Sequence, residues 1–573
     1  MGRKKQGAQQ KDRGPEKGAI VKRAKGLVRV ALVYPNRYQA GMSSLGFQSL
    51  YQRLNELDGV ACERVFLPDK PREKICPVSC ETGLPLSRFD IVAFSISFEN
   101  DYLNIILLLE RAGIPLHTST RGEKDPLVMA GGVACFMNPE PVAVYMDCIF
   151  LGEAEFLIKG FFDLYASWKR EGAPRQEFRQ RAAKELIGIY VPSLYRPAYT
   201  DDGVFSGLIG KIDGIPEKIP VVRVEDLSRI KTTTAVMTSQ TAFKNSYLIE
   251  TGRGCPHGCR FCSAGYVYRP PRFYPTDVIL DAMEEAKPLT TRVGLVSAAV
   301  SDHPDIDLIC SKGLEKNLKI SFSSLRVDGL TDAMIKNLVN AGTKTATIAP
   351  EAGSEKMRRI INKKIREADI LSGVRRLVSH GIINVKLYFM IGLPFETDDD
   401  VEAIAAMTEK IRDVFVDASR KQKKIGTMTL SINPFVPKPG TPFQWSCMLS
   451  VPVLKKRLNI IKKRLKRCAN MKINAESNRV SRINALLARG DRRMAEVMET
   501  AARSGWSTAL KQHQEYCQDQ LYSPRSTAAT LPWDFIDTGV TKDFLKNELA
   551  RAEAFKISGD CPMIPCEKCR ICR

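Results

Sequence analysis

The sequence predicts an α/β protein that consists of two consecutive parallel-sheet units followed by a mostly helical region. Short apolar runs alternate with helical periodicities over residues 27–165, and the same alternation returns over residues 245–450. Residues 451–573 show mainly helical periodicity and end in a cysteine-rich tail. Buried apolar strands separated by helices are typical of parallel sheets. A length of 573 residues also exceeds one ordinary domain.

The first unit is expected to be a Rossmann-like open sheet, because its strand candidates are apolar and helical patterns separate them. Residues 166–244 are less regular and contain several prolines and glycines, so we interpret them as a connecting region. The strand candidates of the first unit are LVRVALVY (27–34), FDIVAFSISF (89–98), PLVMAGG (126–132) and DCIFLG (147–152).

The second unit contains six consecutive strand–helix pairs, which predict a partial TIM-type (β/α)6 barrel with its chemistry at the C-terminal ends of the strands. The residues of one face of the fifth and of the sixth strand are mostly polar, and this indicates a cavity rather than a packed interior. They are Asn384, Lys386, Tyr388 and Met390 on the fifth strand, and Thr427, Thr429, Ser431 and Asn433 on the sixth.

Composition favours a cytoplasmic protein with metal or redox chemistry. The chain has no run of 18 apolar residues, which argues against a membrane span. Residues 1–26 are basic and polar with no apolar stretch, so we expect a disordered arm and no signal peptide. Sixteen cysteines without a secretion signal favour metal binding or redox chemistry over disulfides.

The net charge of +22 comes from 86 basic and 64 acidic residues. It favours an anionic partner, such as RNA, an acidic protein or the phosphates of a large cofactor. Part of the excess lies in the sequence LKKRLNIIKKRLKRCANMKI (454–473), where leucine and isoleucine recur at helical spacing. The basic residues of that segment therefore have a second interpretation, as the solvated face of a helix.

Three cysteines, Cys255, Cys259 and Cys262, stand in the sequence TGRGCPHGCRFCSAGY after the first barrel strand. A zinc site usually needs four protein ligands, and no fourth cysteine or properly spaced histidine is near, although His257 lies inside the loop. Buried structural cysteines are a second interpretation. The third is a [4Fe–4S] cluster held by three thiolates, with one iron left open for another ligand.

The C-x3-C-x2-C spacing after the first strand of a βα barrel, with Phe261 before the last cysteine, resembles the radical S-adenosylmethionine (SAM) superfamily. The resemblance implies that SAM binds the open iron. It also implies that an electron from the cluster cleaves SAM to methionine and a 5′-deoxyadenosyl radical, which abstracts hydrogen from a substrate. The electron would come from a reductant such as flavodoxin or ferredoxin.

Further segments in the same order resemble the SAM-contacting parts of that superfamily. The sequence APEAGSEKMRRIINKK follows the fourth strand, and a carboxylate there can accept both ribose hydroxyls. A Gly-Gly-Glu-like segment is missing after the second strand, where the chain has LVSAAVSDHPD, and Asp302 and His303 face the substrate or cap a helix. The SAM-binding candidates are Phe261, Ser297, Ser324, Arg326, Glu351, Ile391, Gly392 and Pro394; catalytic residues are unknown.

The sequence MAGGVACFMNPEPVAVYMDCIFLGEAE (129–155) resembles the second half of the cobalamin-binding-type domain that precedes many radical SAM barrels. That domain carries D-x-H-x-x-G after its first strand, and its histidine can ligate cobalt. Here Asn36 and Tyr38 stand at the Asp and His positions, and Gly41 fits. Either cobalamin binds with no protein ligand to cobalt, or the fold persists without this cofactor; Gly131 and Gly132 allow a nucleotide tail or a tight turn.

The chain ends in four closely spaced cysteines, for which a second iron–sulfur cluster, zinc and a thiol redox relay are all open interpretations. We treat Cys76 and Cys80 as ordinary cysteines. The segments 433–445 and 485–506 resemble parts of uncharacterised radical SAM proteins, or are a proline-rich linker and a basic amphipathic helix. The four tail cysteines are Cys561, Cys566, Cys569 and Cys572.

The sequence thus predicts a radical SAM enzyme with a cobalamin-binding-like N-terminal domain. Its reaction is open among methyl transfer, sulfur insertion and rearrangement, and its substrate is unknown, with RNA and protein as candidates. The alternative is a non-catalytic iron–sulfur protein that carries electrons or senses redox state. Such a protein needs a cluster but no SAM pocket, so cleavage of SAM separates the two hypotheses.

Overall fold

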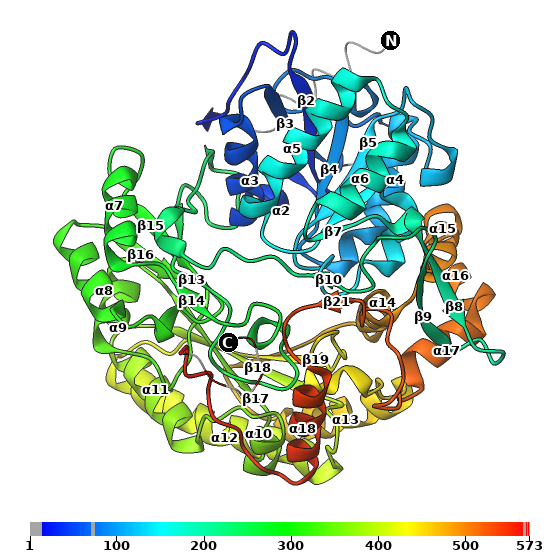
Figure 1. Ribbon diagram of the computed structural model, residues 1–573. Helices are drawn as coiled ribbons and strands as arrows, with labels where there is room; N and C mark the ends of the chain where they lie inside the picture. The colour runs from blue at the N-terminus through cyan, green and yellow to red at the C-terminus, as the bar shows by residue number, and fades with distance from the viewer. Residues whose placement is uncertain (1–13, 70–74, 565, 567–568, 570, 572–573) are drawn as a thin grey trace.

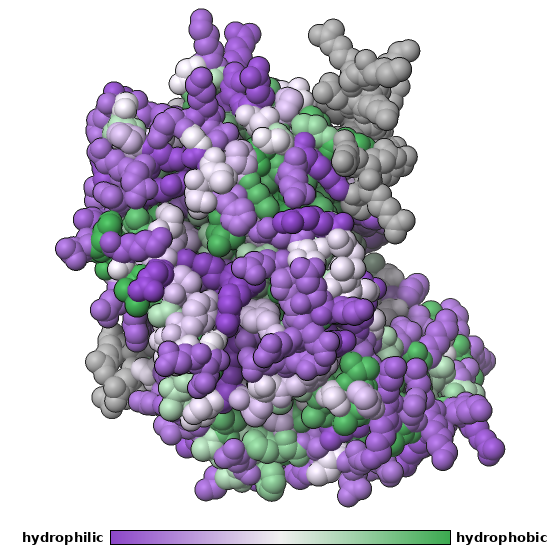
Figure 2. All heavy atoms as spheres, turned by 90° about the vertical axis from the view of Figure 1, so that its right-hand side faces the viewer, coloured by the Kyte–Doolittle hydropathy of each residue, from purple (hydrophilic) through white to green (hydrophobic). Residues whose placement is uncertain are grey.

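The computed structural model describes residues 14–69, 75–564, 566, 569 and 571. Figure 1 shows two α/β units, with the N-terminal unit at the top of the view and the barrel unit below it. No helix in the described ranges is both long enough and apolar enough to cross a membrane. The face in Figure 2 is mostly hydrophilic, and its hydrophobic residues gather in separate patches.

The N-terminal unit is built on a six-stranded sheet with the strand order β3-β2-β4-β5-β6-β7, in which only the pair β6 and β7 is antiparallel. The first five strands have a doubly wound order that reverses between β2 and β4, and ligands bind outside the carboxyl ends of the strands at such a reversal. The Rossmann-like sheet is confirmed. Its elements are β2 (Val28–Tyr34), α2 (Tyr38–Met42), α3 (Leu45–Glu56), β3 (Val60–Phe66), β4 (Ile91–Ser95), α4 (Tyr102–Ala112), β5 (Leu127–Gly131), β6 (Cys148–Phe150), α5 (Ala154–Glu171), α6 (Arg175–Glu185) and β7 (Ile189–Tyr190).

The N-terminal unit begins earlier than the sequence predicts. Residues 14–26, expected to belong to a disordered arm, instead pack on the unit, while residues 1–13 lie outside the described ranges. β1 (Glu16–Lys17) pairs with β11 (Met237–Thr238), and the amide of Ile20 donates to the hydroxyl of Tyr51 at 2.7 Å. These partners lie far away in the sequence, so local composition alone could not reveal them.

The same unit also ends later than predicted, because α6 and β7 complete it from within the expected connecting region. Helix α6 has a polar sequence, yet its Arg175 and Arg179 are buried against Asp147 in the core. Burial raises the pKa of Asp147, but Arg175, Arg121 and Arg179 outweigh it and hold this pKa below its usual range. A buried carboxylate with three arginine partners explains why so polar a helix packs here.

The second unit is an open parallel barrel in two sheets, β12-β15-β16 and β17-β18-β19-β20, and every neighbouring pair is parallel. The partial TIM-type barrel is confirmed, with β20 as a seventh strand beyond the six predicted. Its strands are β12 (Tyr247–Glu250), β15 (Arg292–Val296), β16 (Lys319–Phe322), β17 (Thr345–Glu351), β18 (Asn384–Ile391), β19 (Met428–Pro434) and β20 (Met471–Ala475). Its helices are α7 (Thr276–Ala286), α8 (Ile306–Glu315), α9 (Asp332–Asn340), α10 (Glu355–Ile360), α11 (Glu367–Ser379), α12 (Asp398–Lys421) and α13 (Val451–Leu465).

Strand β18 alternates as the sequence predicts. Val385, Leu387 and Phe389 are fully buried, whereas the intervening residues are only partly buried on the opposite face. On that face the ammonium of Lys386 donates to the hydroxyl of Tyr388 at 2.7 Å. A polar pair at the barrel interior agrees with an internal cavity rather than a dry core.

Helix α13 carries the basic stretch that the sequence left open. Its Leu454, Ile461 and Leu465 are buried, while the lysines of the helix are exposed. The helix connects β19 to β20 and so belongs to the outer ring of the barrel. This arrangement agrees with the solvated-face interpretation of these lysines.

The C-terminal region is mostly helical, as predicted, but the segment 485–506 is not one amphipathic helix. It breaks at Gly490, and the residues around the break are buried between the two units. Arg489 donates to the carbonyl of Ser523 at 3.0 Å, and Arg492 forms an ion pair with Glu140 at 3.0 Å. The helices are α14 (Asn478–Arg489), α15 (Met494–Ser504), α16 (Trp506–Gln512), α17 (Gln514–Tyr522) and α18 (Lys542–Glu553).

Candidate functional site

The cysteine loop leaves the barrel directly after β12 and returns through a short antiparallel ladder between β13 (Gly252–Arg253) and β14 (Arg272–Phe273). The loop is thereby fixed at the carboxyl end of the first barrel strand, where barrel chemistry is expected. Gly254 has a φ of 82°, and a Cβ there would lie 2.7 Å from the carbonyl oxygen of Tyr268. Only glycine fits this position without displacing the backbone.

The three cysteines of the loop lie within eight residues of one another, with Cys259 buried and Cys255 and Cys262 partly exposed. Burial raises the pKa of Cys255 to about 12 and that of Cys262 to about 11. Thiols with such values bind metal only by releasing their protons, so cluster assembly here is coupled to deprotonation.

The histidine inside this loop, His257, is engaged by two carboxylates. Among the described residues, no group of three or more His, Cys, Asp and Glu converges as it would on a single metal ion. His257 is occupied on both ring nitrogens, since Nε2 bonds to Asp302 at 2.7 Å and Nδ1 bonds to Asp560 at 2.9 Å. His257 is therefore held by Asp302 and Asp560 and is not free to join the three cysteines as a ligand.

Arg260 anchors the loop to two distant segments, and its side chain is fully buried. Its Nε donates to Glu548 in α18 at 3.1 Å, and its Nη1 donates to the carbonyl of Ile360, the last residue of α10, at 2.7 Å. Its Nη2 donates to the carbonyl of Lys556 at 2.8 Å. The sequence analysis missed this residue, because none of its partners is near in the sequence.

Ser297 and Ser324 meet at the carboxyl ends of the second and third barrel strands. The hydroxyl of Ser324 donates to the carbonyl of Ser297 at 3.0 Å, and the neighbouring Ser323 does the same at 3.0 Å. Arg326 lies on the same side of the barrel and donates to Asp328 at 2.6 Å. To bind the carboxylate of SAM, the guanidinium of Arg326 would have to release Asp328 or donate to both carboxylates at once.

Glu351 ends β17 in a strained conformation, with a φ of 67°, next to a register shift in the β17–β18 pair. A non-glycine residue in this region costs energy and is frequent at functional sites. Burial raises the pKa of Glu351, although the ammonium of Lys363, 3.7 Å from the carboxylate, opposes this. Lys363 is a further candidate that the sequence analysis did not single out.

The turn after β18 is held by Glu396 in the sequence GLPFET. The amide of Gly392 donates to its carboxylate at 2.6 Å, and Arg457 of α13 does so at 2.6 Å. Ile391 and Gly392 are both buried, and a Cβ on Gly392 would lie 3.0 Å from Leu454 of α13, whereas Pro394 is half-buried. Burial raises the pKa of Glu396 to about 7 despite these two donors.

Phe261 packs half-buried against a small hydrophobic cluster that includes Ala352, Leu393 and Met390. The cysteine loop, the end of β17 and the turn after β18 therefore meet at one place. His303 is buried and bonds to the carbonyl of Tyr274 at 2.9 Å, which makes it a structural residue.

The positions of the D-x-H-x-x-G pattern in the N-terminal unit are used for packing. The ring of Tyr38 contacts that of Phe66 at 5.2 Å between centroids, and its hydroxyl bonds to Glu16. A Cβ on Gly41 would lie 2.3 Å from Phe66. Asn36 donates to Asp101 at 2.7 Å. These side chains do not fit a cobalt ligand.

A cavity of about 410 Å³ lies between the two units. Ser95, Ser97 and Gly131 line it from the strand ends of the N-terminal sheet, at the reversal between β2 and β4. Gly254 and Ser297 line it from the barrel, beside the cysteine loop. Its size is that of a site for a small organic molecule. Both units line it, and on the N-terminal side it lies where ligands bind in doubly wound sheets.

Comparison with known proteins agrees with this geometry. Residues 46–192 match the family model for radical SAM proteins, N-terminal, and residues 249–408 match that of the radical SAM superfamily. The uncharacterized protein MJ0966 of Methanocaldococcus jannaschii is 30% identical over 474 residues, which is 82% of this chain and 90% of that protein.

Two solved structures are similar to this chain at low sequence identity. The radical SAM methyltransferase TsrM from Kitasatospora setae, with cobalamin and a [4Fe–4S] cluster bound, is 13% identical over 71% of this chain and 75% of its own, with a TM-score of 0.44. The cobalamin-dependent SAM radical enzyme OxsB, with aqua-cobalamin and SAM bound, is 12% identical over 92% of this chain and 79% of its own, with a TM-score of 0.44.

The fold and site define an enzyme that works with an iron–sulfur cluster and SAM at the mouth of a partial barrel. The chain belongs to the radical SAM superfamily. Membership implies a [4Fe–4S] cluster, SAM and an external reductant.

Proposed function

We propose that the protein modifies a substrate by radical chemistry at the barrel mouth, with Cys255, Cys259 and Cys262 as ligands of the cluster. The observation that carries this proposal is the C-x3-C-x2-C loop, which lies at the strand ends of the barrel within the segment that matches the radical SAM superfamily. When bound, the cluster and SAM supply reductive cleavage to methionine and a 5′-deoxyadenosyl radical that abstracts hydrogen. The residues around the loop bind and orient SAM.

The SAM-binding roles follow from the chemistry of each side chain. Glu351 accepts hydrogen bonds from the ribose hydroxyls, and its fixed backbone holds the carboxylate in place. Arg326 binds the carboxylate of SAM, for which a guanidinium is suited. Gly392 and Pro394 contact the adenine, with Phe261 beside them. Ser297 and Ser324 present hydroxyl and carbonyl groups to the amino end of SAM.

Anaerobic purification, cluster reconstitution and incubation with SAM and a strong reductant test this function. We expect 5′-deoxyadenosine, methylthioadenosine or S-adenosylhomocysteine as the product. Cys259→Ala should remove the cluster of this loop and abolish the cleavage, while Cys76→Ser, at an exposed cysteine outside the loop, should change neither. A reconstituted and reduced protein that leaves SAM intact would overturn the proposal in favour of an electron carrier.

The reaction type depends on what fills the cavity between the units. Methyl transfer through cobalamin needs cobalt in the N-terminal unit, and Tyr38 and Asn36 do not fit a cobalt ligand there. Cobalamin would therefore bind here only without a protein ligand to cobalt, and we propose instead that the cavity takes part of the substrate. Cobalt analysis after growth with cobalamin decides the point, since stoichiometric cobalt would favour methyl transfer over sulfur insertion or rearrangement.

The substrate class is proposed from charge. A net charge of +22 favours an anionic macromolecule, such as RNA or an acidic protein. Binding of total RNA at increasing salt separates the two, because RNA binding falls steeply as counterions compete.

A further inference from the structure

The C-terminal tail returns to the cysteine loop. After α18, the amide of Ser558 donates to the side chain of Asn362 at 2.9 Å. Two residues later Asp560 bonds to His257, and the amide of Cys561 donates to the carbonyl of Pro256 at 2.8 Å. Two of these contacts fasten the tail to the cysteine loop, and the first fastens it to the segment after α10.

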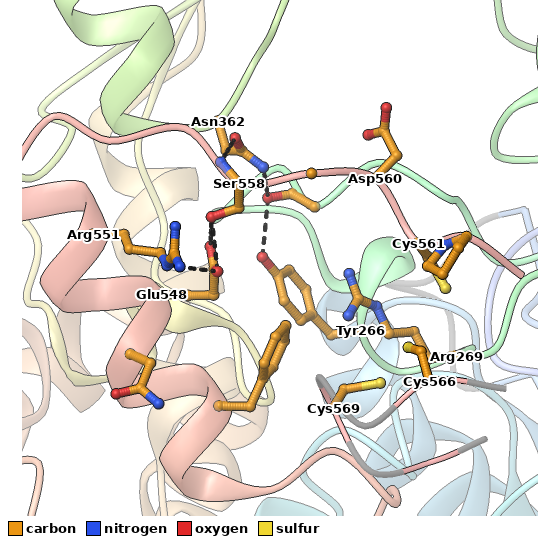
Figure 3. Close-up of a pocket in the computed structure, with 15 residues that line it drawn as sticks. Tyr266, Arg269, Asn362, Glu548, Arg551, Ser558, Asp560, Cys561, Cys566 and Cys569 are labelled. Atoms are coloured by element: carbon orange, nitrogen blue, oxygen red, sulfur yellow. Dashed lines mark hydrogen bonds and ion pairs between the residues drawn. The ribbon is translucent and has the colours of Figure 1, made fainter. Parts of the chain in front are cut away.

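A cavity of about 350 Å³ lies between the tail and the loop (Figure 3). Cys561, Cys566 and Cys569 all line it, and Figure 3 shows them on one side, beside Arg269. Gly258 lines it from within the C-x3-C-x2-C motif itself. The two sets of cysteines therefore lie on either side of one short stretch of backbone.

The surroundings of the cavity suit an anionic metal centre. The guanidinium of Arg269 is held over the rings of Tyr266 and Phe544, at 5.1 Å from each centroid. A fixed positive charge beside these cysteines suits a negatively charged group in the cavity. Cys561 and Cys569 are buried, as ligands of a protected cluster are.

The arrangement of the tail cysteines favours a cluster over zinc. Zinc draws its ligands to a single point at about 2.3 Å per sulfur, and no described group of three potential ligands converges in that way. The thiolates of an iron–sulfur cluster bind separate iron atoms and stay further apart. The loop cysteines share this property. The sequence supplies a fourth tail cysteine, Cys572, which lies outside the described residues.

We propose that Cys561, Cys566 and Cys569 bind a second iron–sulfur cluster, which passes electrons to the first; the relay rests on the proposed SAM-cleaving function, whereas the cluster does not. The path runs from Cys561 through its amide hydrogen bond to Pro256, which is bonded to Cys255. One electron enters the second cluster from a one-electron carrier protein of the flavodoxin or ferredoxin class. The same electron then moves to the first cluster, and no atom is transferred.

The test compares the full-length protein with the double variant Cys566→Ser/Cys569→Ser, with Cys76→Ser as the control. Wild type and control should hold about eight irons and eight sulfides per chain, and the double variant about four. The electron paramagnetic resonance signal of the reduced first cluster, and its change on adding SAM, should persist in the double variant. That signal shows that the loop is folded.

The relay is measured separately from the cluster count. SAM cleavage driven by flavodoxin should be lost in the double variant, while cleavage driven by a small chemical reductant should persist. Asp560→Ala loosens the tail without removing a ligand, so it should keep eight irons and slow only the flavodoxin-driven reaction. An iron count that is unchanged by the double substitution, or one zinc per chain, overturns the second cluster. Equal losses with both reductants overturn the relay and point to substrate binding by the tail.

Discussion

Replacing Arg260 by methionine should destabilise the cysteine loop by several kcal/mol. The substitution removes the buried guanidinium from Glu548, whose side chain is 7% exposed, and leaves it only the more exposed Arg551 at 3.9 Å. Removing one partner of a buried ion pair costs about 3–5 kcal/mol. The carbonyls of Ile360 and Lys556 also lose a donor, and a buried unpaired group costs about 1–3 kcal/mol. A loss of about 4 kcal/mol or more is therefore expected, a large part of the stability of a typical domain.

Urea unfolding followed by circular dichroism measures this loss, and iron content after reconstitution measures its effect on the loop. Arg359→Ala is the matched control, because this neighbouring arginine is exposed and contributes its carbonyl rather than its side chain. The double variant Arg260→Met/Glu548→Gln should recover part of the loss, since it removes the buried charge of Glu548. If Arg260→Met costs less than about 1 kcal/mol and retains full iron content, the loop is not held by the buried arginine, and the reasoning fails.

Three further predictions concern the SAM side of the barrel. Glu351→Gln should weaken SAM binding by about tenfold, measured by calorimetry, because an amide accepts fewer hydrogen bonds than a carboxylate; unchanged affinity would remove Glu351 from the site. Gly254→Ala should prevent cluster assembly, whereas Gly46→Ala, where no atom lies within 4 Å of the new Cβ, should not; equal iron contents would contradict this. Burial raises the folded-state pKa of Glu396 from 4.5 to about 7, so the folded state favours the protonated form. Its stabilising contribution is present below pH 4.5 and is lost as the pH rises to about 7, by up to about 3 kcal/mol, and Glu396→Gln should flatten that part of the melting-temperature profile.

The two sheets were predictable from the sequence, and the loop of three cysteines could be singled out, because both depend on local patterns. Alternating burial in β18 places Lys386 and Tyr388 on one face, and three cysteines within one loop need no long-range information. Strand β20 was missed because it is short, exposed and partly charged. Nothing near Arg260 in the sequence indicates Glu548 as its partner. The hydrogen bond from the amide of Cys561 to the carbonyl of Pro256 also could not be predicted, because the two residues are far apart in the sequence.

The predicted domain boundaries failed for the same reason. Residues 14–26 and helix α6 are polar. The first segment packs because the amide of Ile20 donates to the hydroxyl of Tyr51, and α6 packs because Arg175 forms an ion pair with the buried Asp147. The spacing of the SAM-contacting segments did indicate which strand ends meet. It did not indicate that Arg326 is already paired with Asp328 or that Lys363 lies beside Glu351.

The turn between α14 and α15 limits how far the two units can separate. Asn138 donates to the carbonyls of Ala488 and Gly490, and Arg492 forms an ion pair with the fully buried Glu140. This turn therefore connects the N-terminal unit to the C-terminal helices. Separating the two would leave the buried Glu140 without its counterion Arg492, which costs about 3–5 kcal/mol. We therefore expect the two units to stay in contact during turnover.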